Sequence, residues 1–161
     1  MASVVRGFSI TGVDGYVVEV ETKTIHGQPM MSIVGLGDTA IKEARERLEA
    51  VLNQGTYHFP EMKIVINLAP SYIQKRGSHF DLPMAVGLLI ESGQIKPKNV
   101  QKYGFIGELS LNARLRPCIG VLSMIIAAKE AGIKDVIVPK ENVEEASLVN
   151  GMNIFGFSTL Q

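Results

Sequence analysis

The segment from Lys75 to Leu89 constrains the fold of this chain more than any other. It joins a basic, glycine-containing turn to a continuous apolar stretch, and it follows a strand-like run at 62–68 that has little polar alternation. Such a run predicts a central strand covered on both faces, and the apolar stretch predicts a helix from Leu82 to about Glu91. We therefore expect a sheet with a packed helix soon after an inner strand.

Asp81 is expected to cap this helix, because an aspartate side chain before the first turn can accept from free backbone N–H groups. Leu82 and Pro83 then take the first two helical positions, where proline is tolerated since those N–H groups have no intrahelical acceptor. Ser78 is a second candidate for the same capping role.

Strand and helix patterns alternate along the rest of the chain. The β-branched runs at 4–10, 16–24 and 30–34 predict an opening antiparallel meander with Val13-Asp14-Gly15 as its first turn. Later patterns predict strands at 104–106, 109–116, 135–138 and 152–157, and helices at 121–131 and 140–149. This order predicts an α/β (α+β) two-layer sandwich with a mixed sheet.

A further helix is expected after Asp38, which is placed to cap it. Its charged residues, from Lys42 to Glu49, are expected to form a solvated face with ion pairs Lys42–Glu46 and Glu43–Arg47. Gly55 is expected to end the helix. Its apolar residues fall on one face: Ile41, Ala44, Leu48, Val51 and Leu52.

Composition restricts the class of protein. The 161 residues fit one domain, 1–161, and 46% of them are hydrophobic, which is enough for a sizeable core. Lysine plus arginine equal aspartate plus glutamate at 16 each, so no overall field recruits nucleic acid or a membrane. The longest apolar run, 82–90, is too short to span a bilayer, and residues 1–10 lack a signal-peptide pattern. We expect a cytoplasmic location.

Cys118 is the single cysteine, which excludes an intrachain disulfide and suits a reducing compartment. It stands at a predicted helix start, where the pKa of a thiol can be lowered. No base lies nearby in the sequence, so we expect a packed side chain. The histidines, His26, His58 and His79, are scattered and predict no zinc site.

The segment from Gly35 to Ala40 matches the G-x-G-x-x-A form of the dinucleotide fingerprint. Two predicted strands precede it, Asp38 would put a carboxylate where a phosphate should lie, and no acidic residue ends the next strand. A structural turn is the favoured interpretation, and dinucleotide binding through Gly35 and Gly37 is an alternative. The chain has no Walker A motif, so it should not bind ATP in that way.

Several blocks of sequence, in one order, resemble a known family. They cover nearly the whole chain and are more specific than any single motif above. The family usually has proline where this chain has Gly37. The blocks are Val34–Ala40 with Glu43–Arg47, Asn67–Pro70, Lys75–Pro83, Gly107–Leu111 with Arg116-Pro117, and Ala131–Lys134 with Pro139–Asn142. They resemble the N-terminal domain of the ComM/YifB proteins, which are magnesium-chelatase-like AAA+ ATPases.

That domain is similar to the proteolytic domain of Lon, and its fold also occurs in domain 2 of ribosomal small-subunit protein five. Lon uses a serine nucleophile and a lysine base. Gapless matching puts the serine's place at His79 and the lysine's place at Leu122. Leucine cannot accept a proton, so the resemblance implies a segment without catalytic residues. A divergent serine peptidase that uses Ser78 or His79, with Lys75 as its base, is the alternative.

The resemblance also implies a larger bacterial parent protein. Its AAA+ module, with ATP and magnesium, would follow residue 161, and it would form a homo-oligomeric, hexameric ring that works in DNA processing, including branch migration in natural transformation. The present segment would be an accessory module that contacts its own AAA+ module and possibly DNA, without a membrane. The candidates for phosphate contact are Lys75, Arg76, Arg114 and Arg116, for which ordinary surface charge is the competing interpretation.

Overall fold

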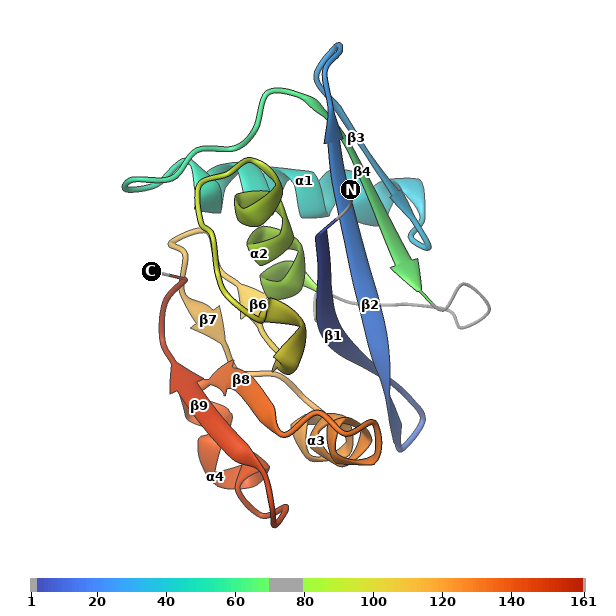
Figure 1. Cartoon of the computed structure of the whole chain (residues 1–161), viewed down its shortest axis with the longest axis vertical. Helices are drawn as coiled ribbons and strands as arrows, with labels where there is room; N and C mark the ends of the chain where they lie inside the picture. Colours follow the sequence, from blue (N-terminus) through green and yellow to red (C-terminus); the bar gives the residue numbers. More distant parts are fainter. Residues whose placement is uncertain (1–2, 70–79, 161) are drawn as a thin grey trace.

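The computed structural model describes residues 3–69 and 80–160. A seven-stranded mixed sheet, ordered β3-β4-β2-β1-β5-β8-β9, forms its centre, and β6 and β7 pair separately (Figure 1). The predicted α/β class with a mixed sheet is confirmed. The strands are β1 (Ser3–Thr11), β2 (Asp14–Ile25), β3 (Met30–Val34), β4 (Lys63–Ala69), β5 (Tyr103–Phe105), β6 (Glu108–Leu109), β7 (Leu115–Arg116), β8 (Asp135–Pro139) and β9 (Asn153–Phe157). The α-helices are α1 (Asp38–Leu52), α2 (Asp81–Glu91), α3 (Val121–Glu130) and α4 (Val143–Ala146), and two 3-10 turns are η1 (Val100–Lys102) and η2 (Lys140–Asn142).

The opening hairpin occurs as predicted, but the meander does not. β1 and β2 pair antiparallel from Ser3↔Thr22 to Thr11↔Asp14, so the turn is Gly12-Val13, and Asp14 already belongs to β2. β3 does not join β2; it pairs parallel with β4, and β4 lies between them. The prediction of a meander was wrong because α1 connects β3 to β4, and a helical crossover returns the chain parallel to its first strand.

Helices pack against both faces of the sheet at its central strands. Neighbouring residues of a strand point to opposite faces, so β1 can contact helices on both sides. A Cβ on Gly7 of β1 would lie 2.8 Å from Cγ of Pro83 in α2. The next residue, Phe8, belongs instead to the core cluster formed with α3. β1 therefore divides a larger core with α1 and α2 from a smaller core with α3 and α4.

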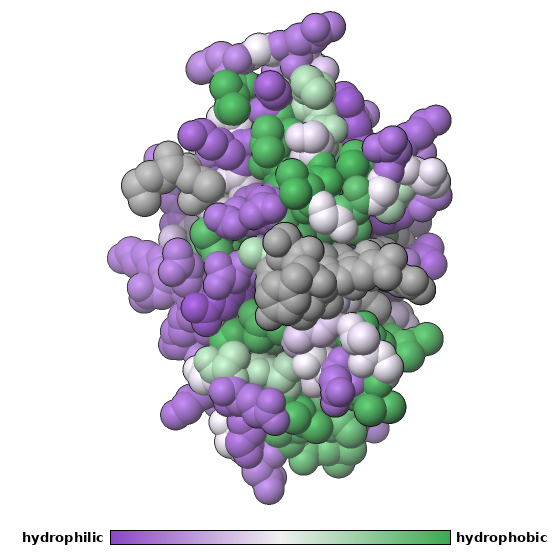
Figure 2. Space-filling view, turned by 90° about the vertical axis from the view of Figure 1, so that its right-hand side faces the viewer, coloured by the Kyte–Doolittle hydropathy of each residue, from purple (hydrophilic) through white to green (hydrophobic). Residues whose placement is uncertain are grey.

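β4 lies inside the sheet, as its sequence predicted, but its two faces differ. Ile64, Ile66 and Leu68 are buried, whereas Val65 and Asn67 between them are only half-buried. The second face is thus less covered than the apolar run predicted. Figure 2 shows one side of the molecule, where hydrophobic surface lies among polar side chains. Within 3–69 and 80–160, no helix is long and apolar enough to cross a membrane.

Both aspartates that were expected to cap helices lie one position inside them. α1 begins at Asp38 with Gly37 as its N-cap, and α2 begins at Asp81 with Phe80 as its N-cap. Neither cap residue makes a side-chain capping bond. The capping predictions for Asp38 and Asp81 were therefore wrong. α1 ends at Leu52, with Asn53 rather than Gly55 at its C-cap.

Candidate functional site

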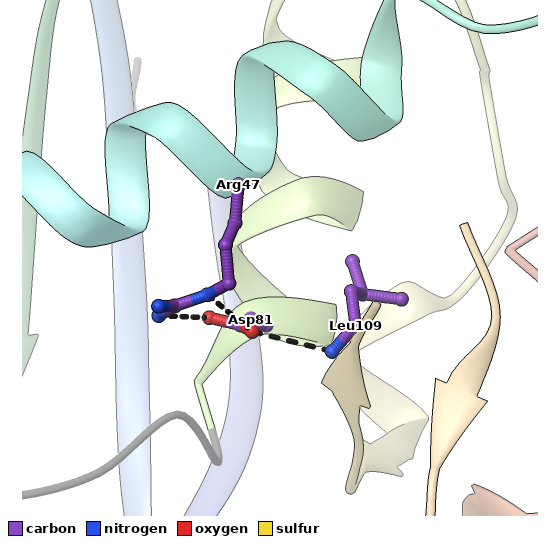
Figure 3. A network of polar contacts seen from close by, with 3 residues as sticks. All are labelled: Arg47, Asp81 and Leu109. Carbon is purple, nitrogen blue, oxygen red and sulfur yellow. Dashed lines mark hydrogen bonds and ion pairs between the residues drawn. The ribbon is translucent and has the colours of Figure 1, made fainter. Parts of the chain in front are cut away.

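The start of α2 carries a buried ion pair with α1 (Figure 3). Asp81 is 1% exposed at its side chain and accepts two hydrogen bonds from Arg47, from Nε at 3.0 Å and from a terminal guanidinium nitrogen at 3.1 Å. The backbone N–H of Leu109 donates to Asp81 Oδ2 at 3.2 Å. One carboxylate thus joins α1, α2 and β6, which is why it faces inward and does not cap its own helix.

The two partners respond differently to this environment. Burial raises the pKa of the Asp81 carboxyl above its usual value, and the hydrogen bonds and charge of Arg47 only partly offset the effect. Burial lowers the pKa of Arg47, but its hydrogen bond to Asp81 and the charge of that carboxylate outweigh burial, so the net shift is upward. Arg47 favours the charged form of the buried Asp81 carboxyl. Removing either residue of the pair would leave the charge of the other without its partner.

A small pocket of about 170 Å³ opens beside this pair, between the first turns of α1 and α2. Asp81 and Arg47 line it with Glu43, and the remaining wall is apolar. Both oxygens of the Asp81 carboxylate accept hydrogen bonds, one from Arg47 alone and the other from Arg47 and the Leu109 N–H. The pair accordingly has a structural role at this place.

The glycines before α1 have a local explanation. Gly35 has φ +111°, and a Cβ there would lie 3.3 Å from Cβ of Leu68. Both observations demand glycine without any ligand. Asp38 lies in the first turn of α1, the place that a dinucleotide phosphate would need. The structural turn is supported, and dinucleotide binding stays a prediction.

Leu122 lies in the first turn of α3, half-buried. Its backbone N–H donates to Glu145 Oε2 at 3.2 Å, so a glutamate from α4 satisfies a free donor at the start of α3. The side chain at the position that matches the protease lysine offers no proton acceptor. His79 and Ser78, at the matching nucleophile corner, lie outside the described residues, as do Lys75 and Arg76.

Cys118 precedes α3 and does not begin it, because the helix starts at Val121. Asn142 binds both its backbone groups: Oδ1 accepts from the N–H at 2.9 Å, and Nδ2 donates to the carbonyl at 3.1 Å. Burial raises the pKa of the Cys118 thiol to about 11. The expected packed side chain is confirmed, since Cys118 is buried, whereas its expected position at the helix start is wrong.

Arg114 and Arg116 are exposed and two residues apart, so they share one face of the β6–β7 ribbon. Glu108 lies directly across from Arg116 in this ribbon. Arg114 has no acidic residue at the matching place: Ser110 lies across from it in the hairpin and donates its backbone N–H to the Arg114 carbonyl at 2.9 Å, and an isolated bridge joins Arg114 to Thr159. Of the two, Arg114 is the better candidate for contact with a phosphate.

Across 3–69 and 80–160, no group of three or more His, Cys, Asp or Glu residues is arranged to hold a metal ion. The predicted ion pairs on α1 are replaced by one between Arg45 and Glu49 at 2.7 Å. Arg47 was expected on the solvated face of this helix but pairs with the buried Asp81. Nothing in the helical pattern distinguished it from its charged neighbours.

Comparisons with known proteins place these features in context. Residues 19–142 match the family model of subunit ChlI of Mg-chelatase. The chain is 36% identical over 149 residues to competence protein ComM of Haemophilus influenzae, covering 92% of this chain and 29% of that protein. It is 38% identical over 149 residues to the uncharacterized protein YifB of Escherichia coli, with the same coverage of 92% and 29%. A Lon protease of Trichlorobacter lovleyi is 30% identical over 146 residues, covering 86% of this chain and 18% of the protease.

Proposed function

Because this chain belongs to the family of subunit ChlI of Mg-chelatase, with ComM and YifB among its relatives, we propose that it is a non-catalytic accessory domain of a magnesium-chelatase-like AAA+ ATPase. The resemblance predicted from the sequence is confirmed at the level of the family. The chain spans about 30% of the length of the curated relatives it matches, between 29% and 31% for the most similar ones. The ATP site, its magnesium and the hexameric ring belong to the remaining part in this proposal.

The observation that carries the proposal is the chemistry of α3. Leu122 occupies the place of the base in the related protease, and a hydroxyl nucleophile without a base is weak. The buried carboxylate of Asp81, on α2, is paired with Arg47 and accepts from the Leu109 N–H. These two features support a domain that acts through its surfaces; its place in a larger DNA-processing ATPase of a bacterial cytoplasm is the part of the proposal that rests on the family resemblance.

DNA contact follows from this role as the activity to test. The name of the Haemophilus relative, a competence protein, supports DNA as the polymer on which the parent acts. The proposal assigns Lys75, Arg76, Arg114 and Arg116 to phosphate contacts, which release counterions and make binding depend on salt. Glu108 opposite Arg116 lowers the expected contribution of that residue.

The test is binding of the 161-residue chain to single-stranded and branched DNA by fluorescence anisotropy at several salt concentrations. We expect binding that weakens with salt and is further weakened by Lys75→Glu/Arg76→Glu. Lys96→Glu/Lys98→Glu reverses two exposed charges elsewhere and is the matched control. Absent or salt-independent binding would remove the DNA role and leave contact with the AAA+ module.

The similarity to a Lon protease favours a second candidate, a divergent serine peptidase that uses Ser78 or His79. It predicts labelling by a serine-reactive phosphonate that is lost in Ser78→Ala, together with cleavage of an unfolded substrate. Leu122→Lys would restore the missing base and should raise that activity if a nucleophile stands ready. A chain that neither labels nor cleaves, with Leu122 or with lysine, excludes this candidate.

A further inference from the structure

β9 is the edge strand of the sheet beside β8 (Figure 1), and it carries exposed aromatic side chains. Because residues two apart in a strand point to the same side, Phe155 and Phe157 share one face of β9. They are 40% and 49% exposed, although phenylalanine is usually buried. Tyr103 of β5 extends this face, with its ring centroid 6.3 Å from that of Phe155. We call the three side chains the aromatic platform.

The opposite face of β9 packs against α4, although Ile154 is only half-buried and Gly156 is exposed. Gly156 points the other way, and a Cβ there would lie 2.4 Å from Cγ2 of Val143 in α4. Ile154 packs into the smaller core. On the platform side, an apolar groove of about 220 Å³ adjoins Phe157 and is closed by Leu115, Leu160 and Leu82. A groove of this size suits one flat ring, since pockets for drug-sized ligands hold about 300–1,000 Å³.

Cations stand at both ends of the platform. Lys102 Nζ lies 5.6 Å from the centroid of the Tyr103 ring, and its side chain is 59% exposed. At the other end lies Arg114, which is exposed. Its backbone forms an isolated antiparallel β-bridge with Thr159, two residues beyond Phe157. The nearby carboxylate, Asp135, is engaged by Lys102 at 3.5 Å and by Asn153 Nδ2 at 2.9 Å. Its negative charge is therefore partly balanced within the fold.

From this arrangement we propose that the aromatic platform binds single-stranded DNA, with bases stacked on Phe155 and Phe157 and backbone phosphates near Lys102 and Arg114. Exposed rings on a sheet supply faces on which any base can stack, and flanking cations follow the backbone. Stacking surface and cations together favour a nucleic acid over an apolar peptide, because a peptide without acidic side chains would gain nothing from Lys102 and Arg114. The inference rests on the proposed DNA role and assigns that role a site.

The experiment measures anisotropy of a short fluorescein-labelled oligothymidylate with the whole chain at low salt. Base–aromatic stacking is worth about 1–3 kcal/mol per base, so Phe155→Ala and Phe157→Ala should each weaken binding by about 5- to 150-fold. Leu148→Ala removes a side chain that is 72% exposed and lies outside the platform, so its affinity should equal that of the unchanged chain. Thermal unfolding of every variant checks that the fold persists.

Two further readouts separate stacking from other roles. Phe155→Leu and Phe157→Leu keep an apolar side chain but lose the ring, so they should bind as weakly as the alanine variants. Arg114→Ala should reduce the dependence of affinity on salt, whereas the phenylalanine variants should leave it unchanged. The chain has no tryptophan and four tyrosines, so quenching of tyrosine fluorescence by the unlabelled oligonucleotide, lost in Tyr103→Phe, would support stacking at this face.

Each unfavourable result has a distinct meaning. Unchanged affinity of the phenylalanine variants, with the chain itself binding DNA, would overturn the platform and leave the proposed function standing. Full affinity of the leucine variants would overturn stacking. Concentration-dependent dimers that disappear in Phe155→Ala would assign the face to a protein contact instead. A chain that binds no DNA at low salt would overturn the platform together with the DNA role, and would leave contact with the AAA+ module as the proposed function.

Discussion

Replacing Arg47 by alanine should destabilise the fold more than any other single charge removal among the described residues. The change leaves Asp81 at 1% side-chain exposure with the Leu109 N–H as its remaining donor. Removing one partner of a buried ion pair costs about 3–5 kcal/mol, because the other charge stays buried. Whole domains unfold with about 5–15 kcal/mol, so this is a large fraction of the expected free energy of unfolding.

The penalty should depend on pH in a defined direction. Burial already holds the pKa of Asp81 above its ordinary 3.8, and Arg47 lowers it. Without Arg47 the pKa of Asp81 in the folded state rises further. A carboxyl with a raised folded pKa binds its proton more tightly in the folded state, so the folded state gains as pH falls through that pKa. The loss caused by Arg47→Ala should therefore shrink between neutral pH and the region of the ordinary pKa.

The assay is equilibrium unfolding in urea, followed by circular dichroism, at neutral and mildly acidic pH. Arg45→Ala is the matched control on the same helix, since it removes an exposed pair with Glu49 worth about 0.3–0.5 kcal/mol. The double variant Arg47→Leu/Asp81→Leu removes both charges and should recover most of the lost free energy. The reasoning is refuted if Arg47→Ala costs no more than Arg45→Ala, or if its penalty is the same at both pH values.

Three further predictions concern the packed interior. In Gly87→Ala the new Cβ would lie 2.6 Å from Oγ1 of Thr22, so the free energy of unfolding should fall by about 1–3 kcal/mol in urea titrations, and an unchanged midpoint would contradict this contact. Thr22 Oγ1 is buried without a hydrogen-bond partner, so Thr22→Val should raise the free energy of unfolding by about 1 kcal/mol, and a clear loss would show that the hydroxyl is satisfied. The Cys118 thiol, with its pKa raised by burial to about 11, should react with iodoacetamide far more slowly in the native than in the unfolded chain, and equal rates would exclude the buried position. Because the unfolded thiol loses its proton near 9.0, the free energy of unfolding should also fall as pH rises from there toward 11, and Cys118→Ala should lack this component.

The sequence predicted where helices and strands lie better than it predicted which strands pair with each other. Periodicity located β1, β2, α1, α2 and α3 because each repeats its pattern over many residues, whereas the helix predicted at 140–149 is only the 3-10 turn η2 followed by the four residues of α4. It could not show that β4 inserts between β3 and β2, since apolar alternation is the same for either neighbour. Strand pairing depends on the whole sheet. The parallel pairing of β3 with β4 follows from the crossover through α1, which local alternation does not reveal.

The candidate site shows the same limit at the level of single residues. An aspartate before an apolar run, as at Asp81, is typical of a helix cap. The same side chain can also form a buried ion pair, and the local sequence does not distinguish the two roles. Its partner Arg47 is 34 positions away, so no local pattern joins them. Leu122 was identified through resemblance alone, and its half-buried place in α3 agrees with a structural residue. The roles of Lys75, Arg76 and His79 stay predictions, because those residues lie outside the described ranges.

The position of the first hairpin has a consequence for the order of folding. β1 and β2 are adjacent in sequence, yet they occupy the middle of the sheet, with β4 and β5 on their outer sides. During synthesis this hairpin is made before the strands that flank it, and both of its edges stay unpaired until residues 63–69 and 103–105 follow. Open edges attract other strands, so a ribosome-bound or truncated chain that ends before 103 should aggregate more readily than the whole chain. The sheet would thus be completed outward from β1 and β2. The strands whose edges are both paired in the native state are the ones whose edges stay unpaired during synthesis.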